Sequence, residues 1–133
     1  MKVRAIKIDV VKMQVYEIYL DSDDLQTYYD AIGNGCSIFE APIKMRPFYE
    51  EWEGGEDAFF VDGEIMLRIH DVKGGFALPG FTRPLVNNGL IVGADKNGET
   101  INHRQSLEVI QNNIQFFAYN GPRTNDEFKS KMN

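Results

Sequence analysis

The feature that most constrains this chain is the alternation of apolar and polar residues at its start. Ile6, Ile8 and Val10 share one face of an extended segment, while Lys7 and Asp9 take the other. After a turn near residues 11–13, a second apolar series follows: Tyr16, Ile18 and Leu20. The pattern predicts a β-hairpin over the first twenty residues, with both apolar series on the same face.

Two short segments change to a helical period. Leu25, Tyr28, Tyr29 and Ile32 form one stripe that ends at Gly33, a residue suited to a helix C-terminus. A second stripe predicts a helix over residues 106–117, capped by Ser106; its apolar members are Leu107, Ile110, Ile114 and Phe117.

The remaining apolar runs read as strands separated by turns. We expect strands over residues 36–43, 89–94 and 99–102, and a hairpin that pairs 58–61 with 64–70 across Asp62-Gly63. Strands and helices do not alternate regularly, which argues against a doubly wound parallel sheet. The predicted fold is a single α+β domain over residues 1–120, with a polar tail over 121–133. Its sheet is mixed but mostly antiparallel, with six or seven strands and two helices on one face.

Composition excludes several classes of protein. The 133 residues include one cysteine, so neither an internal disulfide nor a cysteine-cluster metal site can form. The net charge of −6 disfavours nucleic acid and anionic membranes as partners. No apolar run is long enough to span a bilayer, and the start of the chain does not resemble a signal peptide. We therefore expect a cytoplasmic protein.

An acidic aromatic segment occupies residues 44–57 and shows no clean period. Its side chains can form a contact surface for a protein partner, or they can fold over the sheet and complete the core. We favour the core alternative, and we expect this segment to be the least ordered internal part of the chain. The candidate partner contacts are Phe48, Tyr49, Glu50, Glu51, Trp52 and Glu53.

No catalytic or cofactor motif is complete. The glycine-rich stretch 75–82 has Phe81 where a phosphate-binding loop needs lysine. His70 and His103 are 33 positions apart and have no paired ligand spacing. We therefore predict no catalytic residue, metal or cofactor. His70 and Arg83 remain candidate ligand contacts, because Arg83 can present a guanidinium to a phosphate from a rigid turn.

Three segments together resemble one family. They are the opening AIKIDV hairpin, the helix end YYDAIG, and the late segment PLVNNGLIVGADKNGETI. Their order is similar to that of the domain of unknown function 3846, and the resemblance covers residues 3–117. It implies a compact α+β fold and a phage or mobile-element setting, and it transfers no active-site residue. The acidic aromatic segment has no counterpart in the family.

These observations favour an accessory protein that is not an enzyme and acts through a protein partner, as a modulator of a host process. The alternative is a small-molecule or nucleotide-binding module that uses glycine-rich turns and Arg83. The oligomeric state stays open.

Overall fold

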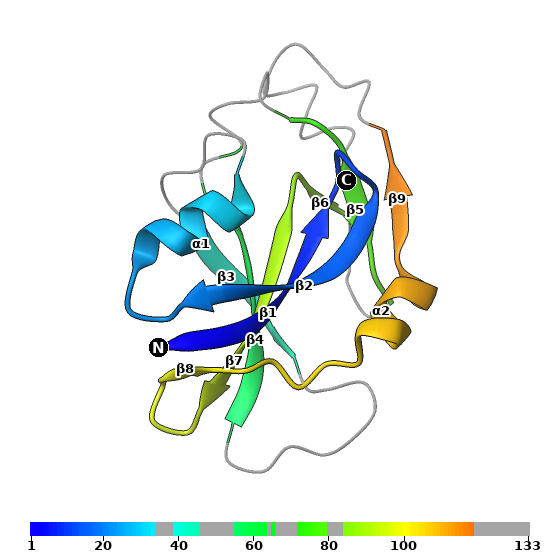
Figure 1. The fold of residues 1–133 in the computed structure, drawn as a ribbon. Helices are drawn as coiled ribbons and strands as arrows, with labels where there is room; N and C mark the ends of the chain where they lie inside the picture. Colours follow the sequence, from blue (N-terminus) through cyan, green and yellow to red (C-terminus); the bar gives the residue numbers. More distant parts are fainter. Residues whose placement is uncertain (34–38, 46–54, 64, 66–71, 80–83, 119–133) are drawn as a thin grey trace.

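The structure is a computed structural model that describes residues 1–33, 39–45, 55–63, 65, 72–79 and 84–118. Two helices and nine strands form in this part of the chain (Figure 1). The strands are β1 (Lys2–Asp9), β2 (Gln14–Asp21), β3 (Phe39–Met45), β4 (Gly55–Asp62), β5 (Gly75–Ala77), β6 (Leu85–Val86), β7 (Gly89–Asp95), β8 (Thr100–Ile101) and β9 (Gln115–Phe117); the helices are α1 (Leu25–Ile32) and α2 (Leu107–Asn113).

The strands form two antiparallel sheets. The larger follows the order β2-β1-β7-β4-β3, with β8 beside β7, and the smaller follows the order β6-β5-β9. Every pairing between described strands is antiparallel. The predicted α+β class is confirmed. The larger sheet has six strands, within the six or seven expected, and a second sheet of three strands was not predicted.

The opening hairpin forms as predicted, but its apolar residues lie on both faces. Ile8 pairs with Val15 on one face, whereas Ala5 pairs with Ile18 and Val3 with Leu20 on the other. The expectation of a single shared face was wrong, because β1 lies inside the sheet and is buried on both sides.

A sheet that is apolar on both faces needs cover on both, and the two helices provide it from opposite sides (Figure 1). On one side, Tyr28 and Ile32 of α1 pack with Val3 and Leu90. On the other, Ile110 of α2 joins Ile6 in a cluster that also includes the small sheet. The prediction that both helices lie on one face was therefore wrong.

The middle of the chain pairs differently from the prediction. β4 lies between β7 and β3, and Phe59 is paired with Ile91 on one side and Ile43 on the other. Both edges of β4 are occupied, so the expected hairpin between 58–61 and 64–70 does not form. The strand over 89–94 and the turn that returns to β8 are confirmed.

The second helix is shorter than its apolar stripe. Ser106 caps α2 as predicted, since its hydroxyl accepts a hydrogen bond from the Val109 N–H at 3.3 Å. The helix ends at Asn113, and the residues after it become β9, which pairs with β5. The predicted tail, residues 121–133, lies outside the described residues.

Candidate functional site

The structure does not describe the site residues that the sequence predicts. The six acidic and aromatic residues between Phe48 and Glu53, together with His70 and Arg83, lie outside the described residues. The acidic aromatic segment is shorter than expected, because β3 extends to Met45 and β4 begins at Gly55. A candidate site must therefore come from other parts of the fold.

The outer edge of β2 is an open edge of the larger sheet. Among the residues that the structure describes, β2 pairs with β1 alone and is the end strand of its sheet. Hydrogen bonds from Gln111 Nε2 to Val15 O (2.8 Å) and from Thr27 Oγ1 to Asp21 O (3.1 Å) show that the odd-numbered residues of β2 point their backbone outward. Between these two ends, the N–H and C=O groups of Glu17 and Tyr19 have no partner among the described residues.

Exposed apolar side chains occur along the whole length of the hairpin and just beyond it. Of the described residues, five large hydrophobic side chains are strongly exposed. Val11 and Met13 lie in the turn before β2, Tyr19 lies within the strand at 67% exposure, and Leu25 begins the helix that follows; the fifth is Met1. Met1 is joined to the end of β2 through the carboxylate of Asp21. Val11 and Met13 are therefore at one end of the hairpin and Met1 and Leu25 at the other, so these side chains do not form one continuous apolar patch.

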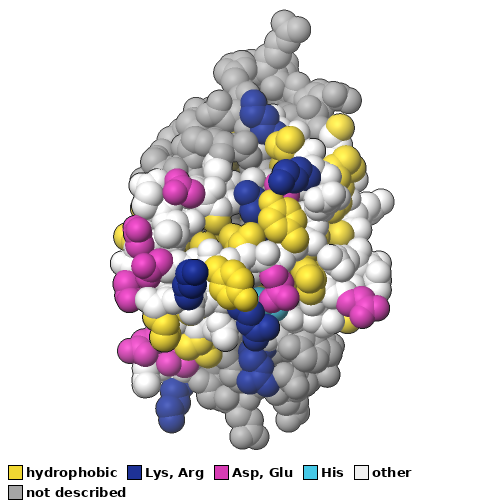
Figure 2. Space-filling view, viewed as in Figure 1, with side chains coloured by type: hydrophobic (Ala, Val, Ile, Leu, Met, Phe, Trp, Pro, Cys, Tyr) yellow, Lys and Arg dark blue, Asp and Glu magenta, His cyan; other side chains and the backbone are white. Residues whose placement is uncertain are grey.

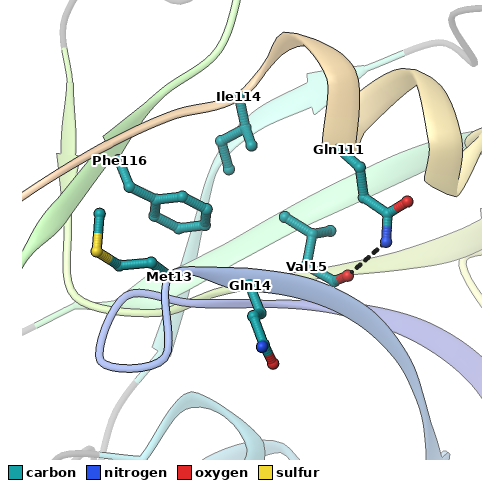
Figure 3. Close-up of a pocket in the computed structure, with 6 residues that line it drawn as sticks. All are labelled: Met13, Gln14, Val15, Gln111, Ile114 and Phe116. Carbon is teal, nitrogen blue, oxygen red and sulfur yellow. Dashed lines mark hydrogen bonds between the residues drawn. The ribbon is translucent and has the colours of Figure 1, made fainter.

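A hollow of about 440 Å³ adjoins the start of β2. The Val15, Ile114 and Phe116 side chains face it from β2 and from the end of α2, while the Gln14 amide points away (Figure 3). Its other lining residues are Met13 and Gln111. No lining residue is charged and four of the six are apolar, although the exposed lining surface is more polar than apolar. The hollow therefore suits an uncharged side chain better than an anionic group.

Basic side chains flank the same strand. Lys2 Nζ lies 6.0 Å from the centre of the Tyr19 ring, and Lys12 Nζ lies 5.6 Å from that of Tyr16. Figure 2 shows Lys and Arg side chains next to hydrophobic ones across the middle of this view. The first twenty residues carry four Lys or Arg and two Asp or Glu, although the whole chain has a net charge of −6.

Three acidic residues belong to the hairpin, and Asp9 and Glu17 are engaged within the fold. Asp9 accepts hydrogen bonds from the Val11 and Lys12 N–H groups and from the Tyr16 hydroxyl. Burial alone would raise the pKa of Asp9, but these bonds lower it below its usual value. Burial and the bond to Asp9 raise the pKa of Tyr16 to about 12. The pair fixes the turn that precedes β2.

Glu17 is held by the segment 102–105, which crosses the face of the sheet. Its Oε2 lies 2.8 Å from Nε2 of His103 and 3.8 Å from the Arg4 guanidinium. An ionised carboxylate only accepts, so Nε2 carries the imidazole proton. His103 Nδ1 is buried and has no partner among the described residues.

Asp57 of β4 also holds the segment 102–105 in place. It is fully buried, and its carboxylate accepts a hydrogen bond from the Arg104 N–H at 3.1 Å. Burial raises the pKa of Asp57, and the bonds from Arg104 and Gln105 oppose that effect only in part. Gly93 allows the segment 102–105 to approach the sheet closely, because a Cβ at this position would lie 2.3 Å from the Asn102 carbonyl oxygen.

This buried polar cluster is suited to holding the segment rather than to chemistry. Glu17 orients His103, but the second ring nitrogen is buried and faces no described cavity. Among the described residues, no three His, Cys, Asp or Glu side chains gather as metal ligands. Within that same part of the chain, no helix is long and apolar enough to cross a membrane.

Comparison with protein families, with curated proteins and with solved structures finds no match to this chain. The candidate site therefore depends on geometry alone. Sequence reasoning missed it because an open edge is a property of strand order. The one signal available was the four Lys and Arg residues concentrated in the hairpin of an otherwise acidic chain.

Proposed function

We propose that this protein is a binding module without catalytic activity, which recognises an extended segment of a partner protein by adding it to β2 as a further strand. The observation that carries the proposal is the pair of outward-facing backbone positions, Glu17 and Tyr19, with no partner among the described residues. Strand addition draws affinity from such main-chain groups and specificity from pockets beside them.

The surroundings of the edge support this function. Natural proteins usually protect an edge strand with a bulge, a proline or a covering element. The pairing of β1 with β2 instead continues without a bulge over all eight residues. The uncharged hollow beside Val15 gives a side chain of the added segment a place to enter.

The resemblance to the domain of unknown function 3846 supports a phage or mobile-element origin and, with it, a partner that belongs to the host cell. We accordingly propose that the protein acts in the cytoplasm. The partner contacts expected at Phe48, Tyr49 and Trp52 remain a separate proposal.

Two substitutions at one position test the function. Tyr19→Pro and Tyr19→Val both remove the exposed ring, but only proline removes the outward N–H group. Peptides are selected from a displayed random library on the immobilised protein, and their affinities are then measured for each variant. We expect the proline variant to bind the selected peptides about tenfold more weakly than the valine variant does, which corresponds to about 1.4 kcal/mol. Equal affinity for the two variants would show that the backbone of β2 is not the binding element.

A further inference from the structure

We infer that the segment added to β2 is acidic and carries an apolar side chain that enters the hollow beside Val15. This inference rests on the proposed function and specifies the chemistry of the partner. It follows from three features: the limits of the open edge, the charges on its two sides, and the position of the hollow.

The open part of the edge is short and has defined ends. Gln111 occupies the Val15 carbonyl at one end, and Thr27 occupies the Asp21 carbonyl at the other. Glu17 and Tyr19 lie between them, and each can exchange two hydrogen bonds with an added strand. The partner therefore contributes a short extended stretch that is centred opposite Ile18.

Cationic side chains stand on both sides of that stretch. Lys2 and Arg4 lie on the α2 side of the sheet, where Tyr19 also projects, since Arg4 and Tyr19 are directly paired. Lys7 is paired with Tyr16 and lies on the α1 side, and the Lys12 ammonium rests over the Tyr16 ring. Side chains of an added strand alternate between these two sides, so acidic residues in either register meet a cation.

The acidic side chains nearby do not neutralise all of these cations. Asp9 is buried and accepts three hydrogen bonds, and Glu17 lies against His103 and Arg4. At the far end, Asp21 and Asp23 share the terminal ammonium group of Met1, so the carboxylates there outnumber that cation by one. Lys7 lies close enough to Asp9 for its charge to stabilise that carboxylate. Lys2 and Lys12 have no ion pair among the described residues, so these are the cations that an acidic segment meets.

The hollow determines where the apolar residue lies. Val15 projects to the α2 side, and Ile114 and Phe116 close the hollow from that side. Gln111 occupies the edge at Val15, so the nearest added residue lies opposite Glu17, and its side chain points to the same side as Val15. The partner segment thus carries an apolar residue near one end and acidic residues beside it.

Two other occupants fit less well. A second copy of this chain would bring the same cations of each hairpin together. A nucleic acid would meet the cations, but it offers no alternating donors and acceptors for Glu17 and Tyr19. The backbone groups therefore favour a peptide.

The test compares two synthetic peptides of about ten residues, a usual strand length. One alternates glutamate with valine and carries a leucine near one end; its match has lysine in place of each glutamate. Each is titrated into the isotopically labelled full chain while amide resonances are followed. We expect the acidic peptide to shift the Glu17 and Tyr19 amides and to bind at least about tenfold more tightly than its match.

A charge-reversed protein provides the matched control. Lys2→Glu combined with Lys12→Glu should abolish the preference for the acidic peptide, whereas Lys96→Glu, in the exposed turn before β8, should preserve it. The amide spectrum of each variant shows whether it folds. The comparison of the two peptides on the wild-type protein does not depend on these variants.

The outcomes separate the two proposals. Equal shifts at Glu17 and Tyr19 with both peptides would overturn the acidic partner and leave strand addition standing. No shift at these amides with either peptide would count against strand addition itself. Shifts of the same amides with single-stranded oligothymidylate but not with the acidic peptide, or a doubling of molecular mass without peptide, would overturn the peptide partner.

Discussion

At the scale of single residues, Gly93 shows how closely the crossing segment approaches the sheet. A Cβ at this position would lie 2.3 Å from Asn102 O and 3.0 Å from Asn102 C, and both are backbone atoms that cannot rotate away. We predict that Gly93→Ala lowers the free energy of unfolding by about 3 kcal/mol, as overpacking does. Chemical denaturation measures the loss.

Gly98→Ala is the comparison for that prediction. Gly98 has a φ of 81° but no atom within 4 Å of an added Cβ. Its replacement should cost about 1 kcal/mol, from backbone strain alone. If the two substitutions cost the same, the close approach at Gly93 is not the cause.

Asp57 gives the molecule a specific dependence on pH. Burial raises its pKa above the ordinary value of 3.8, so the folded state holds this proton more tightly than the unfolded state does. The stability that the group contributes is therefore present at low pH and is lost as the pH rises through the raised pKa. We predict that wild type loses stability relative to Asp57→Asn over that interval.

Urea denaturation of both proteins at a series of pH values checks this sign. The difference in unfolding free energy should move steadily in favour of the asparagine variant as the pH increases from 3.8. A difference that moves in favour of wild type would mean that the bonds from Arg104 and Gln105 outweigh the cost of burial.

At the scale of elements, the stability of α2 depends on the N-cap residue that precedes it. The helix has seven residues, too few to be stable alone, and the Ser106 hydroxyl satisfies one of its free N–H groups. Ser106→Ala should lower the free energy of unfolding by about 1 kcal/mol, and Ser106→Asp should restore most of it. Thermal denaturation of the three proteins tests this. An alanine variant as stable as wild type would show that packing of Ile110 alone holds the helix.

Some elements can be predicted from local sequence patterns alone. The opening hairpin, the end of α1 at Gly33 and the turn between β7 and β8 follow from alternation and turn residues within short windows. The end of α2 does not follow from its own residues. Ile114 and Phe117 continue the helical stripe, yet Phe116 and Phe117 pair with Phe76 and Gly75 of a distant strand.

Pairing across long distances caused the other errors. The run from Ala58 to Val61 is apolar on both faces, which fits a central strand as well as one arm of a hairpin. Only the arrangement of β3 and β7 on its two sides decides between them. Local sequence patterns predict that a strand exists but do not identify its neighbours.

At the scale of the whole molecule, the candidate site is a consequence of strand order. β1 is buried on both faces and paired on both edges, which leaves β2 at the border of the sheet with one edge open. The sequence identified Ile18 and Leu20 as core residues, and burial confirms Leu20. It could not show that Glu17 and Tyr19 between them point their backbone outward.

Amide hydrogen exchange along β2 tests this account most directly. In the free protein, the N–H groups of Tyr16 and Ile18 point into the ladder with β1 and should exchange slowly, while those of Glu17 and Tyr19 should exchange rapidly. Addition of the acidic peptide should slow exchange at Glu17 and Tyr19 and leave Tyr16 and Ile18 slow. Slow exchange at Glu17 and Tyr19 before any peptide is added, or rapid exchange that the peptide leaves unchanged, would contradict the open edge as the binding site.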